Sequence, residues 1–194
     1  MIIAEQEDNI IKDTKKHVIK VAQKLFSEYG YLGVSMSDIA KKLNITKAAL
    51  YYHFTGKAEI YEKVLNEVFS NLTLAIAEVS NKKTIDKKLH QLIKNYLNFG
   101  FKEKNLIKAL MFKLSPNDPQ MVKYIIQLRK QTVDLIHPLI QEMIESKKLT
   151  TKVDSKLATS LLTGMMDGLL LEYSFLNKKI NSEKVSNQII AMLF

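Results

Sequence analysis

The sequence lacks cysteine and tryptophan, and its 194 residues include only six glycines and three prolines. Without cysteine, disulfide-stabilised folds and thiolate chemistry are excluded, and a reducing compartment is an acceptable environment. Alternating runs of β-branched residues are few and no Asn-Gly hairpin signal occurs, so strands are not expected. Because helix-breaking residues are scarce, the composition favours helices.

Signals for export and for membrane insertion are also missing. The N-terminal segment MIIAEQEDNI carries acidic side chains where a signal peptide has a positive flank. The most apolar run, 159–171, is too short to span a bilayer and contains Asp167. With 46% apolar residues, the chain is expected to be a globular, cytoplasmic protein with its own core and no membrane partner.

Positive charge is abundant but unevenly placed. The formal net charge is +9, and the segment 81–130 holds twelve basic against three acidic residues, whereas 1–64 is nearly balanced. Only Arg129 is an arginine, and lysine is more typical of solvated surface than of phosphate recognition. Charge alone therefore identifies no DNA-binding face. The basic span could favour an anionic ligand, but a solvated face is the plainer interpretation.

Helical periodicity runs through the whole chain and predicts an all-α fold of about nine helices. Gly30 is expected to end the first helix in a left-handed conformation, and Gly100 to close a later one. The expected helices are 14–29 after Asp13 or Thr14, 35–43, 47–54, 58–79, 85–99, 103–114 up to Ser115-Pro116, 119–147 after Asp118, 155–176 after Asp154, and a last one capped by Ser182. We assign residues 1–57 to a three-helix head and residues 58–194 to a C-terminal helical-bundle body.

Residues 35–54 carry the most specific pattern in the chain. Ser35 and Asp38 have the spacing of a capping box, which starts a helix sharply. Asn44 stands where the chain must turn with positive φ, which asparagine tolerates better than most residues. Thr46 is placed to cap a second short helix. Two short helices joined by such a turn are typical of a helix-turn-helix.

The second helix of this pair should turn Leu50 and Phe54 inward and present a different face outward. The outward residues are Lys47, Ala48, Ala49, Tyr51, Tyr52 and His53. Small side chains near its N-terminal end would let this helix approach base edges in the major groove of DNA. An ordinary pair of packed helices is the alternative. We prefer the DNA-binding interpretation because caps, turn and anchors agree in spacing, and two outward tyrosines beside a histidine are unusual for plain surface.

This stretch resembles the TetR family of bacterial regulators. The family pattern is matched over about residues 14–65, by Ala22, Leu25-Phe26, Tyr29-Gly30-Tyr31, Val34-Ser35, Asp38-Ile39-Ala40, Leu50-Tyr51-Tyr52-His53-Phe54 and Lys57. Two departures are Asn44, where the family commonly has glycine, and Gly56, where a polar residue is usual. The rest of the chain is similar to the family only in size and helix layout.

The resemblance implies a sequence-specific transcription regulator, usually a repressor that a small-molecule effector releases from a palindromic operator in double-stranded DNA. It implies that phosphates are contacted by Ser35, Tyr51, His53 and Lys57. It also implies that Ser37, Thr46, Lys47, Ala48, Ala49 and Tyr52 lie over bases or the groove wall.

The predicted helix 155–176 is apolar on almost all sides. One apolar face can pack on the chain's own core, but a second needs another partner, and Gly164 and Gly168 would let a helix come close. A wholly intramolecular central helix is the alternative. Resemblance to the family favours a homodimer with a four-helix interface built by the last two helices of each subunit. The expected contact residues are Gly164, Gly168, Leu171, Phe175, Ile189, Met192 and Leu193.

Methionine and aromatic residues of the body could line a pocket for the effector, because methionine adapts to varied apolar ligands. The candidates are Met111, Phe112, Tyr124, Leu128, Met143, Met165 and Met166. Methionine at helical spacing is more often simple core, so packing is the alternative role for each of them.

Catalysis finds no support in the sequence. The four histidines lack metal-ligand spacing, and neither a phosphate-binding glycine loop nor a nucleophile elbow occurs. We therefore expect no enzyme, no cofactor and no metal. Two rivals stay open: a cytosolic ligand-binding or enzymatic helical protein with an incidental helix-turn-helix, and a non-specific, nucleoid-like DNA binder. A footprint on one palindrome would distinguish a regulator from both.

Overall fold

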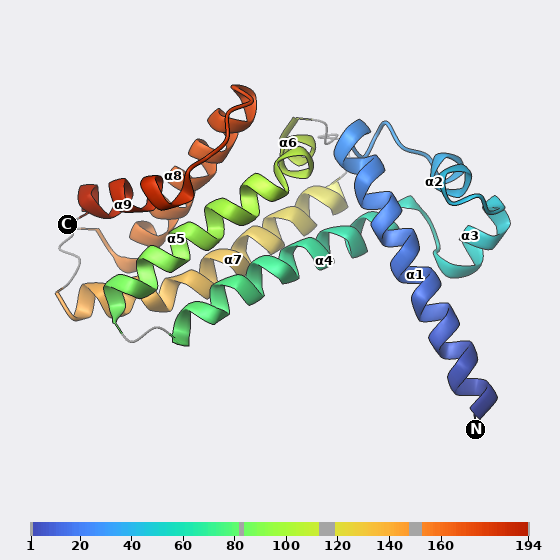
Figure 1. The fold of residues 1–194 in the computed structure, drawn as a ribbon, viewed down its shortest axis with the longest axis horizontal. Helices are drawn as coiled ribbons and strands as arrows, with labels where there is room; N and C mark the ends of the chain where they lie inside the picture. The colour runs from blue at the N-terminus through green and yellow to red at the C-terminus, as the bar shows by residue number, and fades with distance from the viewer. Residues whose placement is uncertain (1, 82–83, 113–118, 148–152, 194) are drawn as a thin grey trace. The chain divides into compact units, whose positions relative to one another are not determined.

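The computed structural model describes the backbone of residues 2–81, 84–112, 119–147 and 153–193, and most side chains from Asp13 onward. Within these ranges all regular structure is helical, as predicted, and Figure 1 shows the helices in chain order. They are α1 (Ile2–Tyr29), α2 (Met36–Leu43), α3 (Lys47–His53), α4 (Lys57–Ala77), a 3-10 turn (Glu78–Asn81), α5 (Ile85–Lys102), α6 (Lys104–Phe112), α7 (Pro119–Glu145), α8 (Ser155–Phe175) and α9 (Ser182–Leu193). The chain divides into two compact units, 1–68 with 105–121, and 69–104 with 122–194.

The first unit is built around an aromatic cluster. The ring of Phe26 meets that of Tyr61 edge-on with centroids 4.7 Å apart, and the ring of Tyr31 lies 4.7 Å from that of Tyr61. Edge-on and tilted ring pairs of this kind are favourable beyond the burial of their area. Gly30 ends α1 with a φ of 76°, as predicted, and its N–H donates to the carbonyl of Phe26 at 2.9 Å. This turn returns Tyr31 to the last turn of α1.

Helix α4 completes the core of this first unit. Ile60, Tyr61 and Val64 from its first turns are all fully buried. By its contacts, the helix is grouped with the first unit up to Val68. The compact unit thus includes the first half of α4, and the functional boundary after residue 57 stays a prediction.

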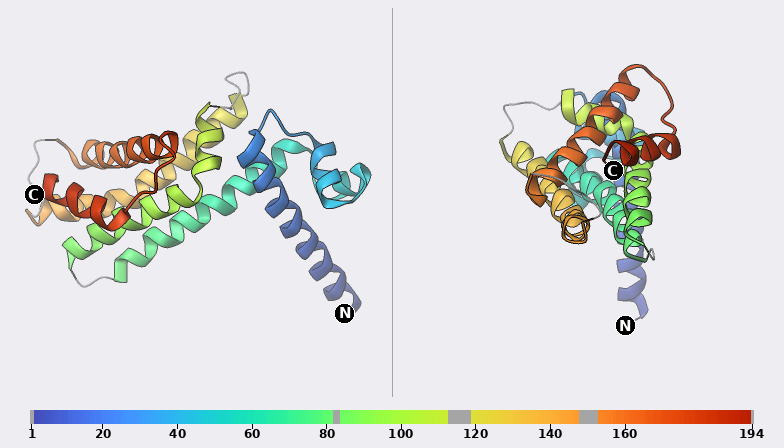
Figure 2. Two further views of the ribbon diagram at one scale, coloured as in Figure 1. Left: turned by 45° about the horizontal axis from the view of Figure 1, so that its top comes forward. Right: turned by 90° about the vertical axis from the view of Figure 1, so that its left-hand side faces the viewer.

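The second unit is a helical bundle in which α5 packs against both α8 and α9, and Figures 1 and 2 show these two helices lying beside α5. Its core brings apolar side chains together from five helices, with Leu72 and Ile76 coming from α4. They include Leu89, Leu92, Ile93 and Leu97 of α5, Ile136, Ile140 and Met143 of α7, Leu162, Met166 and Leu170 of α8, and Val185 and Ile189 of α9. Their three- and four-residue spacing is the amphipathic pattern read from the sequence.

Three of the residues predicted to mark a helix end do not mark one. Helix α1 begins at Ile2, well before Asp13 and Thr14, because no glycine or proline interrupts residues 2–29. Helix α5 continues past Gly100 to Lys102. Gly100 therefore allows close packing of α5 against Leu170 and does not end the helix.

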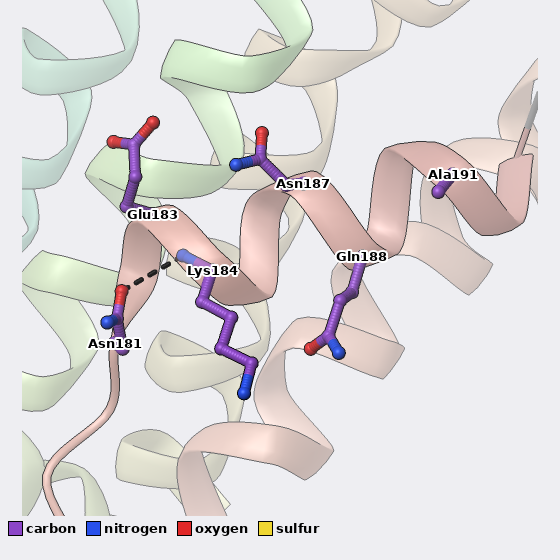
Figure 3. Close-up of a pocket in the computed structure, with 6 residues that line it drawn as sticks. All are labelled: Asn181, Glu183, Lys184, Asn187, Gln188 and Ala191. Carbon is purple, nitrogen blue, oxygen red and sulfur yellow. Dashed lines mark hydrogen bonds between the residues drawn. The ribbon is translucent and has the colours of Figure 1, made fainter.

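The third difference is the start of α9. Asn181, not Ser182, is the capping residue, since its Oδ1 accepts the backbone N–H of Lys184 at 2.9 Å, and Figure 3 draws this hydrogen bond. Ser182 is instead buried at the first helical position. The cap Asp154 on α8 is confirmed, with its Oδ1 accepting from Lys156 and Leu157. The predicted stop at Ser115-Pro116 and cap at Asp118 fall outside the described residues.

No helix within the described ranges combines the length and apolar character that crossing a membrane would require.

Candidate nucleic-acid interface

The predicted capping box at the start of α2 is confirmed. The Oγ of Ser35 accepts the N–H of Asp38 at 3.1 Å, while the N–H and hydroxyl of Ser35 donate to Oδ2 of Asp38 at 2.8 and 2.6 Å. The hydrogen bond from the Ser35 hydroxyl lowers the pKa of the Asp38 carboxyl. The box therefore satisfies donors that the helix itself leaves open and fixes where α2 begins.

The turn between α2 and α3 has the predicted left-handed residue. Asn44 has a φ of 56°, and the N–H of Ile45 donates to the carbonyl of Ala40 at 3.0 Å. Directly after it, Thr46 caps α3 by accepting the N–H of Ala49 on its Oγ1 at 3.1 Å. Local hydrogen bonds thus define both ends of this turn. The direction of α3 relative to α2 is therefore set by the residues of the turn itself.

Buried anchors fix which side of α3 faces outward. Leu50 of α3 and Phe54 at its end are almost fully buried, as are Ile39 and Ala40 of α2. Since α2 and α3 pack against each other, the small Ala40 allows close approach. The opposite face of α3 is left to solvent.

This opposite face carries the residues predicted to read DNA. Tyr52 is 79% exposed and Tyr51 48% exposed, while His53 is half-buried with its ring edge-on to that of Tyr52. Lys47 extends toward Tyr51, its Nζ lying 5.8 Å from the ring centroid. The exposed residues of the predicted DNA site are Ser37 on α2, Thr46 just before α3, and Lys47, Ala48, Ala49, Tyr51 and Tyr52 on α3.

Some predicted phosphate contacts already have structural roles. The hydroxyl of Ser35 belongs to the capping box described above. The Nζ of Lys57 donates to the carbonyl of Tyr31 at 2.8 Å and lies 4.3 Å from the centroid of its ring. The phosphate roles of Ser35 and Lys57 stay predictions. The hydrogen bond from Lys57 also links the start of α4 to the turn that follows α1.

One feature of the head was missed in the sequence. The N–H and hydroxyl of Thr55 both donate to Oε2 of Glu59, at 2.7 and 2.9 Å. The backbone hydrogen bond from Thr55 is the main reason that the pKa of the Glu59 carboxyl is lowered. The four-residue spacing between Thr55 and Glu59 was the signal available in the sequence. This bond orders the connection around Gly56, where an added Cβ would meet nothing within 4 Å.

In the second unit, the residues of α8 predicted to contact a second subunit lie beside further exposed apolar residues of the same helix. The exposed fractions are 46% for Leu157, 58% for Leu161 and 55% for Phe175. Gly164 and Gly168 lie between them, and an added Cβ at either would meet no atom within 4 Å. Leu171 is half-buried. Six residues at alternating spacings of four and three thus form one apolar face, the α8 stripe: Leu157, Leu161, Gly164, Gly168, Leu171 and Phe175.

On α9 the prediction needs correction. Ile189 is only 4% exposed and belongs to the core of its own chain, so it is not available at the surface. The outer side of α9, shown in Figure 3, instead presents Asn187, Gln188 and Ala191. Met192 is 65% exposed. The side chain of Leu193 lies outside the described residues.

The candidate ligand residues divide between core and partial exposure. Met143, Met166 and Leu128 are buried, the first two inside the core of the second unit. Tyr124 and Met165 are half-buried. The side chains of Met111 and Phe112 are outside the described part of the chain. In this conformation the buried residues fill space, which is the packing role considered as the alternative.

Two family models match this chain. The model of bacterial regulatory proteins of the tetR family matches residues 18–64, and the model of the tetracyclin repressor-like C-terminal domain matches residues 82–171. The chain belongs to the TetR family. The first match contains the whole helix-turn-helix, and the second contains α5 and most of α8.

Relatives of known sequence support this TetR assignment. The biofilm operon icaADBC HTH-type negative transcriptional regulator IcaR of Staphylococcus aureus (strain Newman) is 47% identical over 68 residues, which are 35% of this chain and 37% of that protein. IcaR of Staphylococcus epidermidis (strain ATCC 35984) is 48% identical over 56 residues, 29% of this chain and 30% of that protein. The match thus spans about a third of the length of these relatives.

Solved structures share the fold over nearly the whole TetR chain. A putative fatty acid metabolism regulator of Clostridium perfringens has a TM-score of 0.77 and 24% identity, covering 91% of this chain and 95% of that one. The transcriptional regulator FadR of Bacillus subtilis, solved in complex with stearoyl-CoA, has a TM-score of 0.78 and 21% identity, with the same coverage. At these identities the likeness establishes the fold alone.

The body of this TetR protein contains a polar cluster around its only arginine. Nη1 of Arg129 lies 2.7 Å from Oδ2 of Asp167 and donates to the hydroxyl of Tyr96 at 3.0 Å. Its Nη2 donates to Oγ1 of Thr163 at 3.0 Å, and the Tyr96 hydroxyl donates to Oδ1 of Asp167 at 2.6 Å. Burial raises the pKa of Asp167 despite these partners. The cluster joins α5, α7 and α8. Its only signal in the sequence was that the chain contains a single arginine.

A second cluster has the composition of a catalytic triad but not its geometry. Nε2 of His90 lies 3.0 Å from the Ser186 hydroxyl and 3.2 Å from Oε1 of Glu183, so both partners share one ring nitrogen. A triad needs the serine and the carboxylate on opposite ring nitrogens. Ser186 is also fully buried and donates to the carbonyl of Glu183 at 2.9 Å. Among the described residues no group of three or more metal-binding side chains occurs.

Proposed function

We propose that this TetR-family protein is a DNA-binding transcriptional repressor that acts in the cytoplasm and is released from a palindromic operator by a small-molecule effector. The observation that carries the proposal is the presentation of α3. Its start is capped by Thr46, its inner side is anchored by Leu50, and its opposite side exposes Tyr51 and Tyr52. An exposed recognition helix of this kind fits the major groove.

The test is selection of bound fragments from random duplex DNA, followed by footprinting of the selected site. Lys47→Ala should change the preferred base beneath the start of α3, if the ammonium group reaches a guanine edge. Lys130→Ala, at an exposed position of α7 in the body, removes the same charge and should leave the base preference unchanged. Equal affinity for random DNA and the selected site, at fixed salt, would refute a specific regulator.

A homodimer completes this proposal, with the α8 stripe as its main contact. The stripe repeats every three to four residues, which suits a left-handed crossing of two α8 helices, and its glycines permit close approach. Two heads on one dimer must read sites about 34–36 Å apart, or a multiple of that. Joining them adds their contacts without a second full loss of translational freedom.

Light scattering at micromolar concentration tests the dimer. The wild type should have about twice the chain mass of 22.3 kDa. Gly168→Arg places bulk and charge in the stripe and should give a monomer with lost operator affinity. Asn98→Arg, at an exposed position of α5, adds the same group outside the stripe and should leave the dimer intact. A wild-type mass near 22.3 kDa would contradict the proposal.

The effector would bind the body and shift the population of conformers. It can release DNA only if it binds the DNA-incompetent conformer more tightly than the competent one. Because FadR of Bacillus subtilis was solved with stearoyl-CoA, long-chain acyl-CoA esters are a reasonable first class to test. A ligand that binds tightly in calorimetry but leaves operator affinity unchanged in gel shift would not be the effector.

A further inference from the structure

The outer side of α3 is unusually apolar for a surface that is proposed to meet DNA. Ile45 is 36% exposed and Tyr52 79% exposed, and both Ala48 and Ala49 are exposed between them. Ile45, which precedes α3, and Ala48, Ala49 and Tyr52 of α3 make up what we call the α3 apolar face. A contiguous exposed apolar surface on a protein commonly marks a contact with a partner.

Hydrogen-bonding side chains are scarce beside this face. Every residue of α3 is described, and of the types that hydrogen-bond most specifically to base edges, namely Arg, Lys, Asn, Gln, Asp and Glu, the helix contains only Lys47. The Nζ of Lys47 lies near the ring of Tyr51, and the hydroxyl of Thr46 accepts the N–H of Ala49. Direct readout by paired hydrogen bonds is therefore a small part of what α3 can do.

The major groove offers one apolar group on its base edges, the C5-methyl of thymine. Alanine and an aromatic ring are side chains that contact this methyl. A protein partner is a poorer match for the α3 apolar face, because a stable protein interface takes about 20–30 residues a side. The face has four.

We infer that the α3 apolar face recognises thymine methyl groups, so that the operator carries thymines beneath Ala48, Ala49 and Tyr52. This inference rests on the proposed function and specifies its DNA target. Tyr52 is the principal specificity-determining residue, since it presents the largest exposed apolar surface of the four. Lys47 then adds a contact at the edge of the methyl-rich segment.

The experiment replaces each thymine of the selected operator by uracil, which pairs identically and lacks only the methyl. Fluorescence anisotropy at fixed salt should show about fourfold weaker binding for each contacted methyl removed, the effect expected for exposing one such group. Thymines outside the half-sites should tolerate the change. Replacing a non-contacted cytosine by 5-methylcytosine is the matched control for the modified bases and should leave affinity unchanged.

Three variants assign the effect to the side chain. With Tyr52→Ala, the uracil effect should shrink at the position beneath residue 52 and stay at the positions beneath Ala48 and Ala49, while Tyr52→Phe should keep the full effect at every position. Tyr29→Ala removes a tyrosine that is 51% exposed at the end of α1 and should also keep it. Circular dichroism verifies that each variant is folded, and the uracil series on the wild type stands independently of all three.

Several results would overturn the inference while leaving the repressor proposal intact. One is a specific operator whose half-sites contain no thymine under α3, and another is equal affinity for thymine and uracil at every position. A full uracil effect in Tyr52→Ala would remove Tyr52 from the role. Failure to find any preferred sequence would instead refute the proposed function itself.

Discussion

Gly100→Ala should destabilise the body although alanine is the better helix former. Gly100 lies inside α5 and is buried. A Cβ at this position would lie 2.8 Å from Cδ2 and 3.0 Å from Cγ of Leu170 on α8, and closer still to Cδ1. Rotation about the last torsion of Leu170 moves the methyl groups but not Cγ. Since Leu170 is only 6% exposed, it has little room to move as a whole.

The expected magnitude is a balance of two effects. Replacing glycine by alanine within a helix stabilises it by about 1 kcal/mol. Forcing an extra carbon into a packed core costs about 1–3 kcal/mol. The contact at three atoms of one side chain places this site toward the upper part of that range. We therefore expect a net loss of about 1–2 kcal/mol in the free energy of unfolding.

The assay is denaturant unfolding followed by far-ultraviolet circular dichroism at one protein concentration. Leu170→Ala supplies the matched background. It should cost about 2–5 kcal/mol by itself, because it leaves a cavity. In that background no methyl group opposes the new Cβ, so Gly100→Ala should stabilise the protein by about 1 kcal/mol. The sign of the glycine substitution should thus reverse between the two backgrounds.

The same sign in both backgrounds would refute the reasoning. If Gly100→Ala stabilises the wild type as well, Leu170 yields without cost and the packing of α5 on α8 is looser than the structure indicates. If it destabilises both, the new Cβ is opposed by something other than Leu170.

Other substitutions test the remaining contacts. Tyr61→Phe should stabilise the head by about 1 kcal/mol, because the Tyr61 hydroxyl is buried with no hydrogen-bond partner among the described atoms; a lower unfolding midpoint would reveal a partner. Ser35→Ala should lower the midpoint at neutral pH. The lowered pKa of Asp38 adds stability above the unfolded pKa of about 4, which is lost as pH falls through the folded pKa, so the two proteins should converge on acidification; a difference independent of pH would contradict this. Arg129→Met should cost about 1–3 kcal/mol at neutral pH, less than a fully buried pair, since both charged side chains are about a third exposed. Because the pKa of Asp167 is already raised by burial, that carboxyl favours the folded state at low pH and loses this contribution as pH rises, so the loss in the variant should shrink below neutral pH; denaturant midpoints across pH would show it.

The head could be predicted closely because its signals are local. The Ser35–Asp38 box, the turn at Asn44 and the cap at Thr46 each depend on residues within four positions of one another. Such contacts form between neighbours whatever the rest of the chain does. The outer position of Tyr52 follows from the buried position of Leu50 by helical geometry alone.

Contacts between distant helices could not be predicted. Arg129 meets Tyr96, Thr163 and Asp167 across three helices, and no periodicity relates their positions. The bond from Lys57 to Tyr31 spans 26 residues and gives a predicted phosphate ligand a second role. Ile189 was assigned to the dimer contact because its apolar character suits either a core or an interface.

The sequence by itself determined the helices, the helix-turn-helix and the family, because hydrophobic period, caps and turn residues act through the nearest neighbours in the chain. Tertiary structure alone decided which apolar side of a helix packs into the core. It buried Met143 and Ile189 and left Leu161 and Phe175 outside. It also decided that Gly100 is a packing residue and not a helix end. The apolar character of a side chain does not distinguish a place in the chain's own core from a place in a contact with a partner. Either place removes the side chain from water with nearly the same gain in free energy.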